Sequence, residues 1–298
     1  MIFSSISDLW ISRRARPEPA AVASVEGLTP AVVITGGARG IGLALAKRFT
    51  EDGRRVMLIG RKETSLRSAC SELRATQASE PLVLALDVTG SDAGRRIDEA
   101  LDAQGCYLDI LINNAAVGLA GDFVEQHPEE LDALVQLNVT AMTRLTRHAL
   151  APMITRGRGG IINMASLGGL IPGPYQAAYY ASRAYVVSLT RAVASETAGR
   201  GVRVVSVLPG PVETTFHAEM GANNALYRYI MPSLTPDEVA SSVSRGYRLG
   251  HRLIVPGIFN WLVSRFAGII PYNILVPIVG RLLWPGQKLA KPSAIRRP

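Results

Sequence analysis

Cysteine is scarce in this sequence. The 298 residues include only two, Cys70 and Cys106, and neither belongs to a CxxC pair or a His/Cys cluster. Small secreted domains rely on several disulfides, and structural zinc sites need four closely spaced thiolate or imidazole ligands. The composition therefore argues against a disulfide framework and against structural zinc. It suits a reducing compartment, so we expect a cytoplasmic protein.

Acidic residues are missing from the last 60 positions. Residues 239–298 contain nine Lys and Arg but no Asp or Glu, whereas the rest of the chain holds 23 basic and 24 acidic residues. The net charge of +8 therefore belongs to the C-terminal part. A charge placed in this way, without a zinc-finger or RNP-type motif, argues against a nucleic-acid partner.

The first 28 residues lack an apolar core of signal-peptide length. They contain three arginines and several serines, but Asp8, Glu18 and Glu26 interrupt them. Two interpretations remain: a flexible extension over residues 1–28, or an organellar targeting peptide, a class of segment that is poor in acids. The acidic residues favour the flexible extension.

A bilayer-spanning run is missing as well. Residues 258–284 are largely apolar, but Pro271 and Pro277 divide them into pieces shorter than the roughly 20 residues that a transmembrane helix needs. Trp261 and Trp284 stand near cationic residues, a composition suited to a bilayer surface. We expect an amphipathic helical tail over residues 257–298 that either makes a peripheral membrane contact or packs on protein, within its own domain or across a subunit interface.

Hydrophobic residues make up 48% of the chain, enough for a sizeable core. Strands are expected at residues 31–35, 55–59, 82–86, 109–113, 160–165, 202–207 and 252–255. Helices are expected at residues 41–51, 63–75, 93–103, 128–153 and 177–198. This alternation predicts one α/β domain over residues 29–256. Its core is a Rossmann-type doubly wound parallel sheet with helices on both faces and ligands beyond the carboxyl ends of the strands.

Residues 35–42, Thr-Gly-Gly-Ala-Arg-Gly-Ile-Gly, directly follow the first expected strand. Without side chains at Gly36, Gly40 and Gly42 the backbone can turn tightly and approach a phosphate closely. The helix that begins near Ile41 offers free N–H groups and the positive end of its dipole. The segment predicts a dinucleotide pyrophosphate site, although glycine turns also occur for packing alone.

Three further elements follow in order: residues 113–116 (Asn-Asn-Ala-Ala) after a strand, Ser166 after another strand, and Tyr179 with Arg183 four residues later. Together with the glycine turn they resemble the short-chain dehydrogenase/reductase family, whose pattern is TGxxxGxG, NNAG, a serine and a YxxxK pair. The resemblance spans about residues 30–256. It implies an oxidoreductase that moves hydride between a nicotinamide cofactor and a carbonyl or alcohol. The chain departs from the pattern where Arg183 replaces the lysine and an alanine replaces the NNAG glycine.

The resemblance implies further cofactor contacts. Asp87 and Val88 correspond to the family's adenine-contacting pair, in which a carboxylate accepts from the exocyclic amine and a valine packs on the ring. Asn114 and Ala115 are expected at the cofactor, with Ala115 along the ribose path. Four residues match the family's element that flanks the nicotinamide and the phosphate: Pro209, Gly210, Val212 and Thr214. An ordinary Pro-Gly turn explains Pro209 and Gly210 equally well.

The expected second strand ends without an acid. An NAD-binding Rossmann unit usually places Asp or Glu there for the ribose hydroxyls, but this chain has Arg61 and Lys62. Arg39, within the glycine turn, can point to the same ribose corner, and guanidinium groups suit a 2′-phosphate. We expect NADP(H) to be preferred over NAD(H); the alternative is that Arg61 and Lys62 are solvated loop charges.

Hydride transfer at a carbonyl carbon needs a partner that moves a proton on the oxygen. A phenol, with a pKa of about 10, needs a nearby cation for this task. Tyr179 and Arg183 share one face of an expected helix. The resemblance makes Tyr179 the acid/base and Arg183 its cationic partner. It makes Ser166 the group that polarises the substrate oxygen, and Asn138 the residue that holds a water in the proton relay.

Two nearby tyrosines, Tyr175 and Tyr180, lack a cation four residues later, so neither fits the pattern as Tyr179 does.

Arg183 keeps the positive charge of the family's lysine, but its head is bulkier and its charge is more diffuse, so we expect a working, slower enzyme. The alternative is a cofactor-binding sensor or interaction protein with impaired catalysis.

Residues 214–234 are expected to form a lid whose apolar side chains favour a hydrophobic, lipid-like substrate. The resemblance also implies a homo-oligomer.

Overall fold

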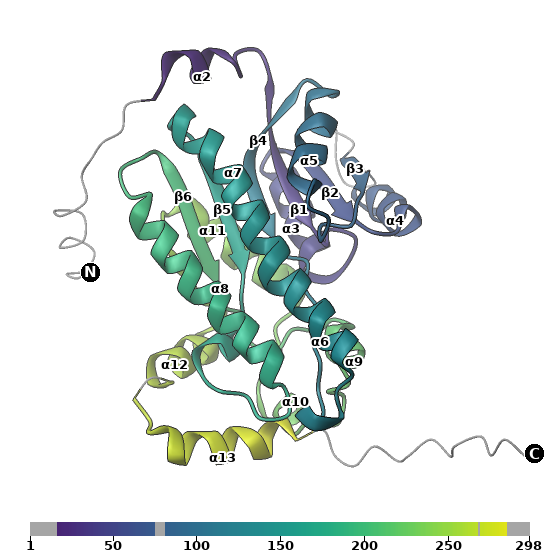
Figure 1. The fold of residues 1–298 in the computed structure, drawn as a ribbon, viewed down its shortest axis with the longest axis vertical. Coiled ribbons are helices and arrows are strands. Elements are labelled where there is room, and N and C mark those ends of the chain that lie inside the picture. Colours follow the sequence, from purple (N-terminus) through teal and green to yellow (C-terminus); the bar gives the residue numbers. More distant parts are fainter. Residues whose placement is uncertain (1–16, 75–80, 268, 285–298) are drawn as a thin grey trace, which may run out of the picture.

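The computed structural model describes residues 17–74, 81–267 and 269–284 (Figure 1). Within them one parallel sheet has the strand order β3-β2-β1-β4-β5-β6-β7. The strands are β1 (Thr29–Thr35), β2 (Arg55–Gly60), β3 (Leu82–Ala85), β4 (Cys106–Asn113), β5 (Gly159–Met164), β6 (Val202–Val207) and β7 (Leu253–Ile254). The winding reverses between β1 and β4, so the ligand crevice of this Rossmann-type fold opens beyond their carboxyl ends. The predicted doubly wound sheet is confirmed.

Helices cover both faces of the sheet because the strands are apolar on both sides. On β1, Val32 and Ile34 belong to one buried cluster and Ala31 and Val33 to another, as the alternation of side chains along a strand requires. The first cluster includes residues of α3 (Gly40–Glu51), α4 (Glu63–Arg74) and α11 (Pro236–Arg248). The second includes residues of α5 (Ala93–Asp102), α7 (Met142–Arg156) and α8 (Ala177–Glu196).

The helix expected over residues 128–153 is interrupted. α6 (Pro128–Val135) passes into a π-helical stretch, η2 (Gln136–Ala141), before α7 begins. π-helical turns are rare and often occur at functional sites. Asn138 lies in this turn with an exposed fraction of 1%. The interruption therefore sets the position of a predicted site residue.

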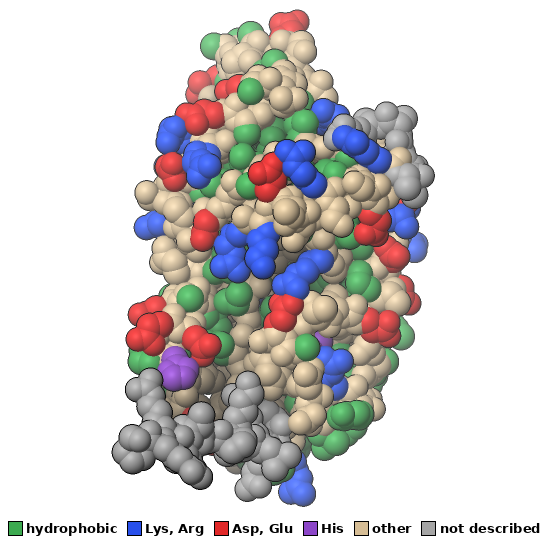
Figure 2. Space-filling model, turned by 90° about the vertical axis from the view of Figure 1, so that its right-hand side faces the viewer, with side chains coloured by type: hydrophobic (Ala, Val, Ile, Leu, Met, Phe, Trp, Pro, Cys, Tyr) green, Lys and Arg blue, Asp and Glu red, His purple; other side chains and the backbone are tan. Residues whose placement is uncertain are grey.

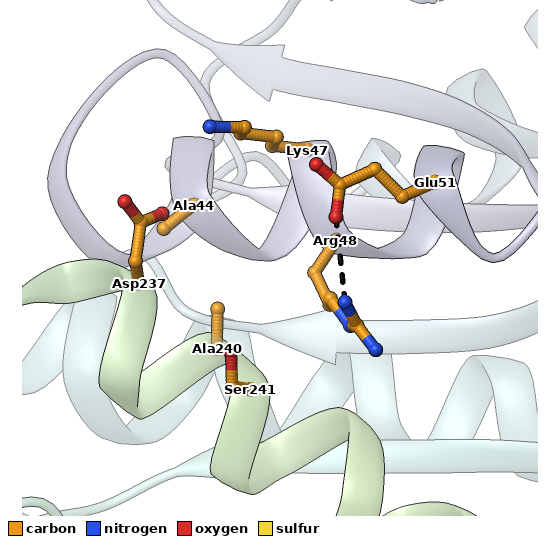
Figure 3. Close-up of a pocket in the computed structure, with 7 residues that line it drawn as sticks. All are labelled: Ala44, Lys47, Arg48, Glu51, Asp237, Ala240 and Ser241. Carbon is orange, nitrogen blue, oxygen red and sulfur yellow. Dashed lines mark hydrogen bonds and ion pairs between the residues drawn. The ribbon is translucent and has the colours of Figure 1, made fainter.

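The start of α11 has a complete capping box. The Thr235 hydroxyl accepts from the N–H of Glu238, and the Glu238 carboxylate accepts from the N–H of Thr235. α11 lies against α3, and between them is a groove of about 110 Å³ (Figure 3). Asp237, Ala240 and Ser241 line it from α11, facing the Ala44 side of α3. No predicted site residue lines this groove.

Several further helices gather at the carboxyl-terminal end of the sheet, where Figure 1 shows α9, α10, α12 and α13. They are η1 (Phe123–Glu125), η3 (Leu167–Leu170), α9 (Phe216–Glu219), α10 (Tyr227–Ile230), α12 (Ile258–Phe266) and α13 (Tyr272–Leu283). Residues 214–234 thus contain two single-turn helices, α9 and α10. A third apolar cluster joins them to α13, through side chains that include Met220, Tyr227 and Leu275.

The opposite end of the molecule carries α2 (Pro19–Ala23), the described part of the predicted N-terminal extension (Figure 1). The N–H of Glu18 donates to the carbonyl oxygen of Thr155 on α7 at 2.9 Å. Residues 1–16, and residues 285–298 of the predicted tail, lie outside the described residues. In the part of the chain that is described, no helix has the length and hydropathy to cross a bilayer.

Candidate active site

The glycine turn connects β1 to α3 and must be bare. Gly36 and Gly40 have φ angles of +64° and +53°, in the left-handed region that favours glycine. A Cβ on Gly42 would lie 2.2 Å from the carbonyl oxygen of Gly36. The N–H groups of Gly40 and Ile41 begin α3 ahead of its first hydrogen bond, which runs from Leu43 to Arg39. They therefore present unpaired donors and the positive dipole end, the features that bind a pyrophosphate.

Hydrogen bonds tie the glycine turn to the end of β4. The Asn114 amide donates to the carbonyl oxygens of Thr35 at 3.0 Å and Gly36 at 3.1 Å. The Thr35 hydroxyl accepts from the N–H groups of Asn114 and Ala115, both at 3.0 Å. These bonds cross the switch point between β1 and β4. Asn114 and Ala115 therefore lie directly beside the turn.

Arg39 precedes α3 with an extended backbone and reaches the lid. Its guanidinium forms a two-pronged ion pair with the Glu219 carboxylate of α9, with an Nη2–Oε2 distance of 2.6 Å. The Thr215 hydroxyl accepts from Arg39 at 2.9 Å and donates to Glu219 at 2.9 Å. The hydrogen bond from Arg39 lowers the pKa of Glu219. Both side chains are largely exposed, at 66% and 46%, so the pair is weak.

The loops after β2 and β3 lie close to each other at the adenosine end of the predicted crevice. Arg61 and Lys62 follow β2 and are exposed, and Figure 2 shows Lys and Arg side chains gathered near the middle of the face on the α4 and α9 side. The Asp87 carboxylate accepts from the N–H of Thr89 at 3.0 Å and from its hydroxyl at 2.8 Å. These bonds, and then the charge of Arg61, lower the pKa of Asp87. Val88 is buried in the core.

Tyr179 and Arg183 form the centre of the predicted catalytic group. Tyr179 lies in the first turn of α8, and the guanidinium carbon of Arg183 is 5.2 Å from the centroid of its ring. Arg183 is 4% exposed, and its Nη1 donates to the carbonyl oxygen of Met164 at 3.0 Å. Burial lowers the pKa of Arg183. Within the described part of the chain, its buried Nε and Nη2 have no hydrogen-bond partner.

Ser166 follows β5, two residues after Met164. Its backbone is extended, and its Oγ accepts from the N–H of Gly168 at 3.1 Å as the cap of η3. The next residues lie against α8, because a Cβ on Gly169 would be 2.7 Å from the carbonyl oxygen of Arg183. Since Ser166 Oγ accepts the bond to Gly168, its own hydroxyl hydrogen is left to donate.

Asn138 holds the loop after β4 and the start of α8 together. Its amide oxygen accepts from the N–H of Val117 at 3.0 Å, and its amide nitrogen donates to the carbonyl oxygen of Val117 at 2.8 Å. The same nitrogen donates to the Ser182 hydroxyl at 3.2 Å, which in turn donates to the Tyr179 carbonyl oxygen at 2.6 Å. The π-helical turn thus links Asn138 to the backbone of Tyr179. Its predicted role in holding a water stays a prediction.

The two neighbouring tyrosines lie in different surroundings. Burial raises the pKa of Tyr180, so its phenol is a poor proton donor and acceptor near neutral pH. Its ring lies against Gly168 and Gly173. Tyr175 has a φ of +64°, the one positive φ of a non-glycine residue in the described chain. Residues in such backbone conformations cluster at functional sites. The Tyr175 carbonyl oxygen accepts from the N–H of Gly121, in the loop beside the lid.

Lid side chains lie against the predicted acid/base. The Phe216 ring of α9 is 5.6 Å from the Tyr179 ring, centroid to centroid. The Tyr227 hydroxyl is 2.8 Å from Nδ1 of His217. Burial lowers the pKa of His217 to about 4 and raises the pKa of Tyr227 to about 12. The pair is therefore neutral near pH 7, and the two atoms share one hydrogen bond whose donor depends on the imidazole tautomer. No sequence motif predicted this pair.

The residues after β6 connect the turn, the lid and the tail. The Pro209 carbonyl oxygen accepts from the N–H of Leu167 at 3.0 Å, and Val212 forms an isolated parallel bridge with Leu234. A Cβ on Gly40 would be 3.1 Å from Cγ2 of Thr214. A Cβ on Gly210 would be 2.3 Å from the side-chain oxygen of Asn260 on α12. Asn260, which the sequence did not identify, is buried and donates to the carbonyl oxygen of Pro256 at 2.8 Å.

The residues present fit a nicotinamide dinucleotide. The bare turn suits the pyrophosphate, and the unpaired N–H groups of Arg183 suit the hydroxyls of the nicotinamide ribose. The described residues contain no group of three or more His, Cys, Asp and Glu side chains that could hold a metal ion.

Comparison with known proteins defines the class. The family model of the short chain dehydrogenases matches residues 30–225. The chain therefore belongs to the short-chain dehydrogenase family and is an oxidoreductase of that family. A short chain dehydrogenase of Pseudocercospora fijiensis is 34% identical over 202 residues, which cover 67% of this chain and 65% of that protein. The chain thus spans slightly less than two thirds of that relative.

A second relative is the 2,5-dichloro-2,5-cyclohexadiene-1,4-diol dehydrogenase LinX of Sphingobium indicum, 35% identical over 63% of this chain and 75% of LinX. Among solved structures, a short-chain dehydrogenase from Sphingobium yanoikuyae in complex with NADPH has a TM-score of 0.70 and 27% identity, covering 80% of this chain and 94% of that one. An actinorhodin polyketide ketoreductase with NADPH has a TM-score of 0.69 and 29% identity, covering 77% and 95%.

Proposed function

We propose that this chain interconverts a carbonyl and an alcohol on a hydrophobic small molecule by hydride transfer, with Tyr179 as the acid/base. The observation that carries the proposal is the position of Tyr179. It lies over the guanidinium of Arg183, which is bonded to the end of β5, at the same edge of the sheet as the bare glycine turn. When bound, the nicotinamide ring supplies or accepts the hydride.

The chain's own groups have distinct tasks in the direction of reduction. Ser166 donates its free hydroxyl hydrogen to the substrate carbonyl oxygen and polarises it, and Tyr179 delivers the proton to the same oxygen. Arg183 keeps a positive charge beside the phenol and holds the cofactor ribose with its unpaired N–H groups. Asn138 fixes the backbone of Tyr179 through Ser182. Catalysis in the opposite direction reverses the proton movements.

The proposed cofactor is NADP(H) in preference to NAD(H). No acid follows β2, and Arg61, Lys62 and Arg39 supply positive charge at the adenosine end. Several similar solved structures carry the phosphorylated cofactor in their names, including the NADPH complex from Sphingobium yanoikuyae and a metagenomic short-chain oxidoreductase with NADP. Arg39 then binds the 2′-phosphate, while Asp87 and Val88 contact the adenine. The Pro209 to Thr214 segment flanks the nicotinamide and the phosphates.

The test is calorimetric titration of the purified protein with NADPH, NADH, NADP and NAD, followed by a screen of hydrophobic ketones and alcohols. Tighter binding of the phosphorylated pair and turnover of at least one substrate support the proposal. No binding of any of the four overturns it. The proposal also includes a homo-oligomer in the cytoplasm. Size-exclusion chromatography with light scattering tests the oligomeric state, and cell fractionation tests the location.

A second candidate function rests on Arg183. Its guanidinium is already bonded to Met164, and its charge is more diffuse than that of the family's lysine. Under this alternative the chain is a cofactor-binding sensor or interaction protein with impaired catalysis. Tight binding of NADPH with no turnover over a broad panel, in both the wild type and Arg183→Lys, distinguishes it from the enzyme.

A further inference from the structure

The helix α13 is apolar on two sides. Leu275, Val279 and Leu283 are buried in the cluster shared with the lid. Ile274 and Ile278, on another side of the same helix, are each 54% exposed. A helix that is hydrophobic all round needs an apolar environment on both sides. Among the described residues, that environment is found on the lid side.

Exposed apolar side chains also occur on α12, the helix before α13. In the described chain, large hydrophobic side chains that are exposed concentrate in residues 258–284, which contain eleven of the twenty-one. Ile258, Trp261 and Phe266 are among them, with exposed fractions of 76%, 47% and 57%. We call these exposed apolar side chains of residues 258–284 the tail surface. Exposed apolar side chains concentrated in one segment are typical of binding surfaces for protein or membrane.

The charge of the tail surface indicates which partner it fits. No Asp or Glu occurs between residues 239 and 298, which contain nine Lys and Arg. Arg265 of α12 and Arg281 of α13 are both exposed beside the apolar side chains. A second copy of this chain would bring its own cations to a symmetric contact and would repel. A bilayer with anionic headgroups offers apolar tails and negative charge together, the combination that interfacial helices bind.

The α13 part of the tail surface lies on another side of the helix from the side chains that face the lid and the predicted acid/base. The buried side of α13 joins a cluster with Met220 and Tyr227 of the lid, and Tyr179 packs against the same cluster. One helix therefore separates Tyr179 from the exposed apolar face. The helix with the exposed apolar side chains is therefore also the helix whose buried side reaches the cluster beside Tyr179.

We propose that the tail surface docks on an anionic lipid bilayer without crossing it, and that the active site takes its substrate, a lipid-like carbonyl compound or alcohol, from that bilayer. The part that concerns the substrate rests on the proposed function. The docking itself does not, because it needs neither cofactor nor turnover. The proposed peripheral contact through residues 257–298 is thereby assigned to the exposed sides of α12 and α13.

The test is cosedimentation of the full chain with vesicles of phosphatidylcholine alone or mixed with phosphatidylglycerol, at low and high salt. We expect binding to the mixed vesicles that salt weakens. The double variant Phe266→Ser with Ile278→Ser removes apolar side chains at exposed positions and should lower the partition coefficient at least about tenfold. A matched control, Val124→Ser with Leu249→Ser, changes exposed side chains outside the tail surface and should bind like the wild type.

Charge and depth give two further readouts. Arg265→Gln with Arg281→Gln should weaken binding to the mixed vesicles and reduce its salt dependence, whereas Arg96→Gln with Arg191→Gln should not. In a Trp10→Phe background only Trp261 and Trp284 remain, so their emission should shift to the blue on vesicle addition. An intact NADPH affinity in each variant shows that the fold and the cofactor site are unaffected.

Two results overturn the docking proposal. One is absence of binding to the mixed vesicles at low salt. The other is a Phe266→Ser, Ile278→Ser variant that binds vesicles normally but changes from oligomer to monomer, which assigns the tail surface to a second copy. If the vesicles bind while the four nicotinamide cofactors do not, the docking stands and the oxidoreductase proposal fails. If the cofactors bind normally and the vesicles do not, the docking proposal fails and the oxidoreductase proposal stands.

Discussion

Arg183 stands one helical turn after Tyr179, with its guanidinium carbon 5.2 Å from the centre of the phenol ring and its Nη1 on the carbonyl oxygen of Met164. The arginine therefore reaches across from α8 to the end of β5, where Ser166 follows. The strand end, the cation and the phenol form one unit. Replacement of the family's lysine by arginine keeps the charge in this unit and adds a bond to the sheet.

Tyr179→Phe should reduce turnover by roughly 10²- to 10⁴-fold, since the phenylalanine ring keeps the packing against Phe216 but cannot exchange a proton. Cofactor affinity should change little. Steady-state kinetics and calorimetry measure the two quantities. Tyr185→Phe is the matched control on the same helix, because its hydroxyl bonds only to Thr143 among the described residues. Unchanged turnover in the Tyr179 variant would remove this residue as the acid/base.

Arg183→Lys should preserve or increase the rate, because a compact ammonium concentrates the charge near the phenol and still bonds the ribose. Arg183→Met removes the charge and the N–H donors but keeps an unbranched stem, and should lower both turnover and cofactor affinity. Single-turnover rates and dissociation constants for NADPH separate these effects. A lysine variant that loses activity as fully as the methionine variant would show that this site needs the bond to Met164 rather than the charge alone.

Glu219→Gln should tighten binding of NADPH a few-fold more than binding of NADH. The carboxylate occupies the guanidinium of Arg39, so a 2′-phosphate that uses Arg39 must displace it, whereas NADH has no phosphate at that position. The effect is small because the pair is exposed. Calorimetry with both cofactors provides the ratio. Glu213→Gln, also exposed and directly before the lid, is the control and should leave the ratio unchanged.

Stability should fall as the pH is lowered through the titration of His217. Its folded pKa of about 4 lies below the ordinary histidine value of 6.5, so the unfolded chain binds the proton first. The stability that neutral His217 contributes is present above pH 6.5 and is lost progressively down to about pH 4, amounting to at most about 3 kcal/mol. Urea unfolding at several pH values measures it.

His217→Phe should remove that part of the pH dependence, because no imidazole is then left to be protonated at this buried position. The same substitution at the exposed His251 should keep the wild-type profile. If both variants retain the full slope between pH 6.5 and 4, another group is responsible for it.

The sheet and the glycine turn could be predicted because their signals are local. Apolar runs give strands, and Gly36 and Gly40 occupy backbone conformations that other residues avoid. The π-helical turn at residues 136–141 could not be predicted in this way. Residues 128–153 have an ordinary helical pattern, and the interruption contains Asn138, whose bonds to Val117 come from another part of the chain.

Contacts between distant segments left no mark in the sequence. Arg39 was expected to face a ribose phosphate, and it was found paired with Glu219, 180 positions later. Nothing around Glu219 distinguishes it from a solvated surface acid. Charged side chains have many suitable partners, and only the folded chain decides between them. The proposed roles of the site residues therefore depend on the experiments above.

Asn260 fills the space above Gly210 and holds the carbonyl of Pro256. A chain shortened after residue 256, where the expected domain ends, would lose Asn260 and leave the backbone at Gly210 without this neighbour. We expect such a truncation to loosen the segment that follows β6, which belongs to the proposed nicotinamide site. The packing that supports this segment thus extends past the end of the expected domain, to a residue of α12.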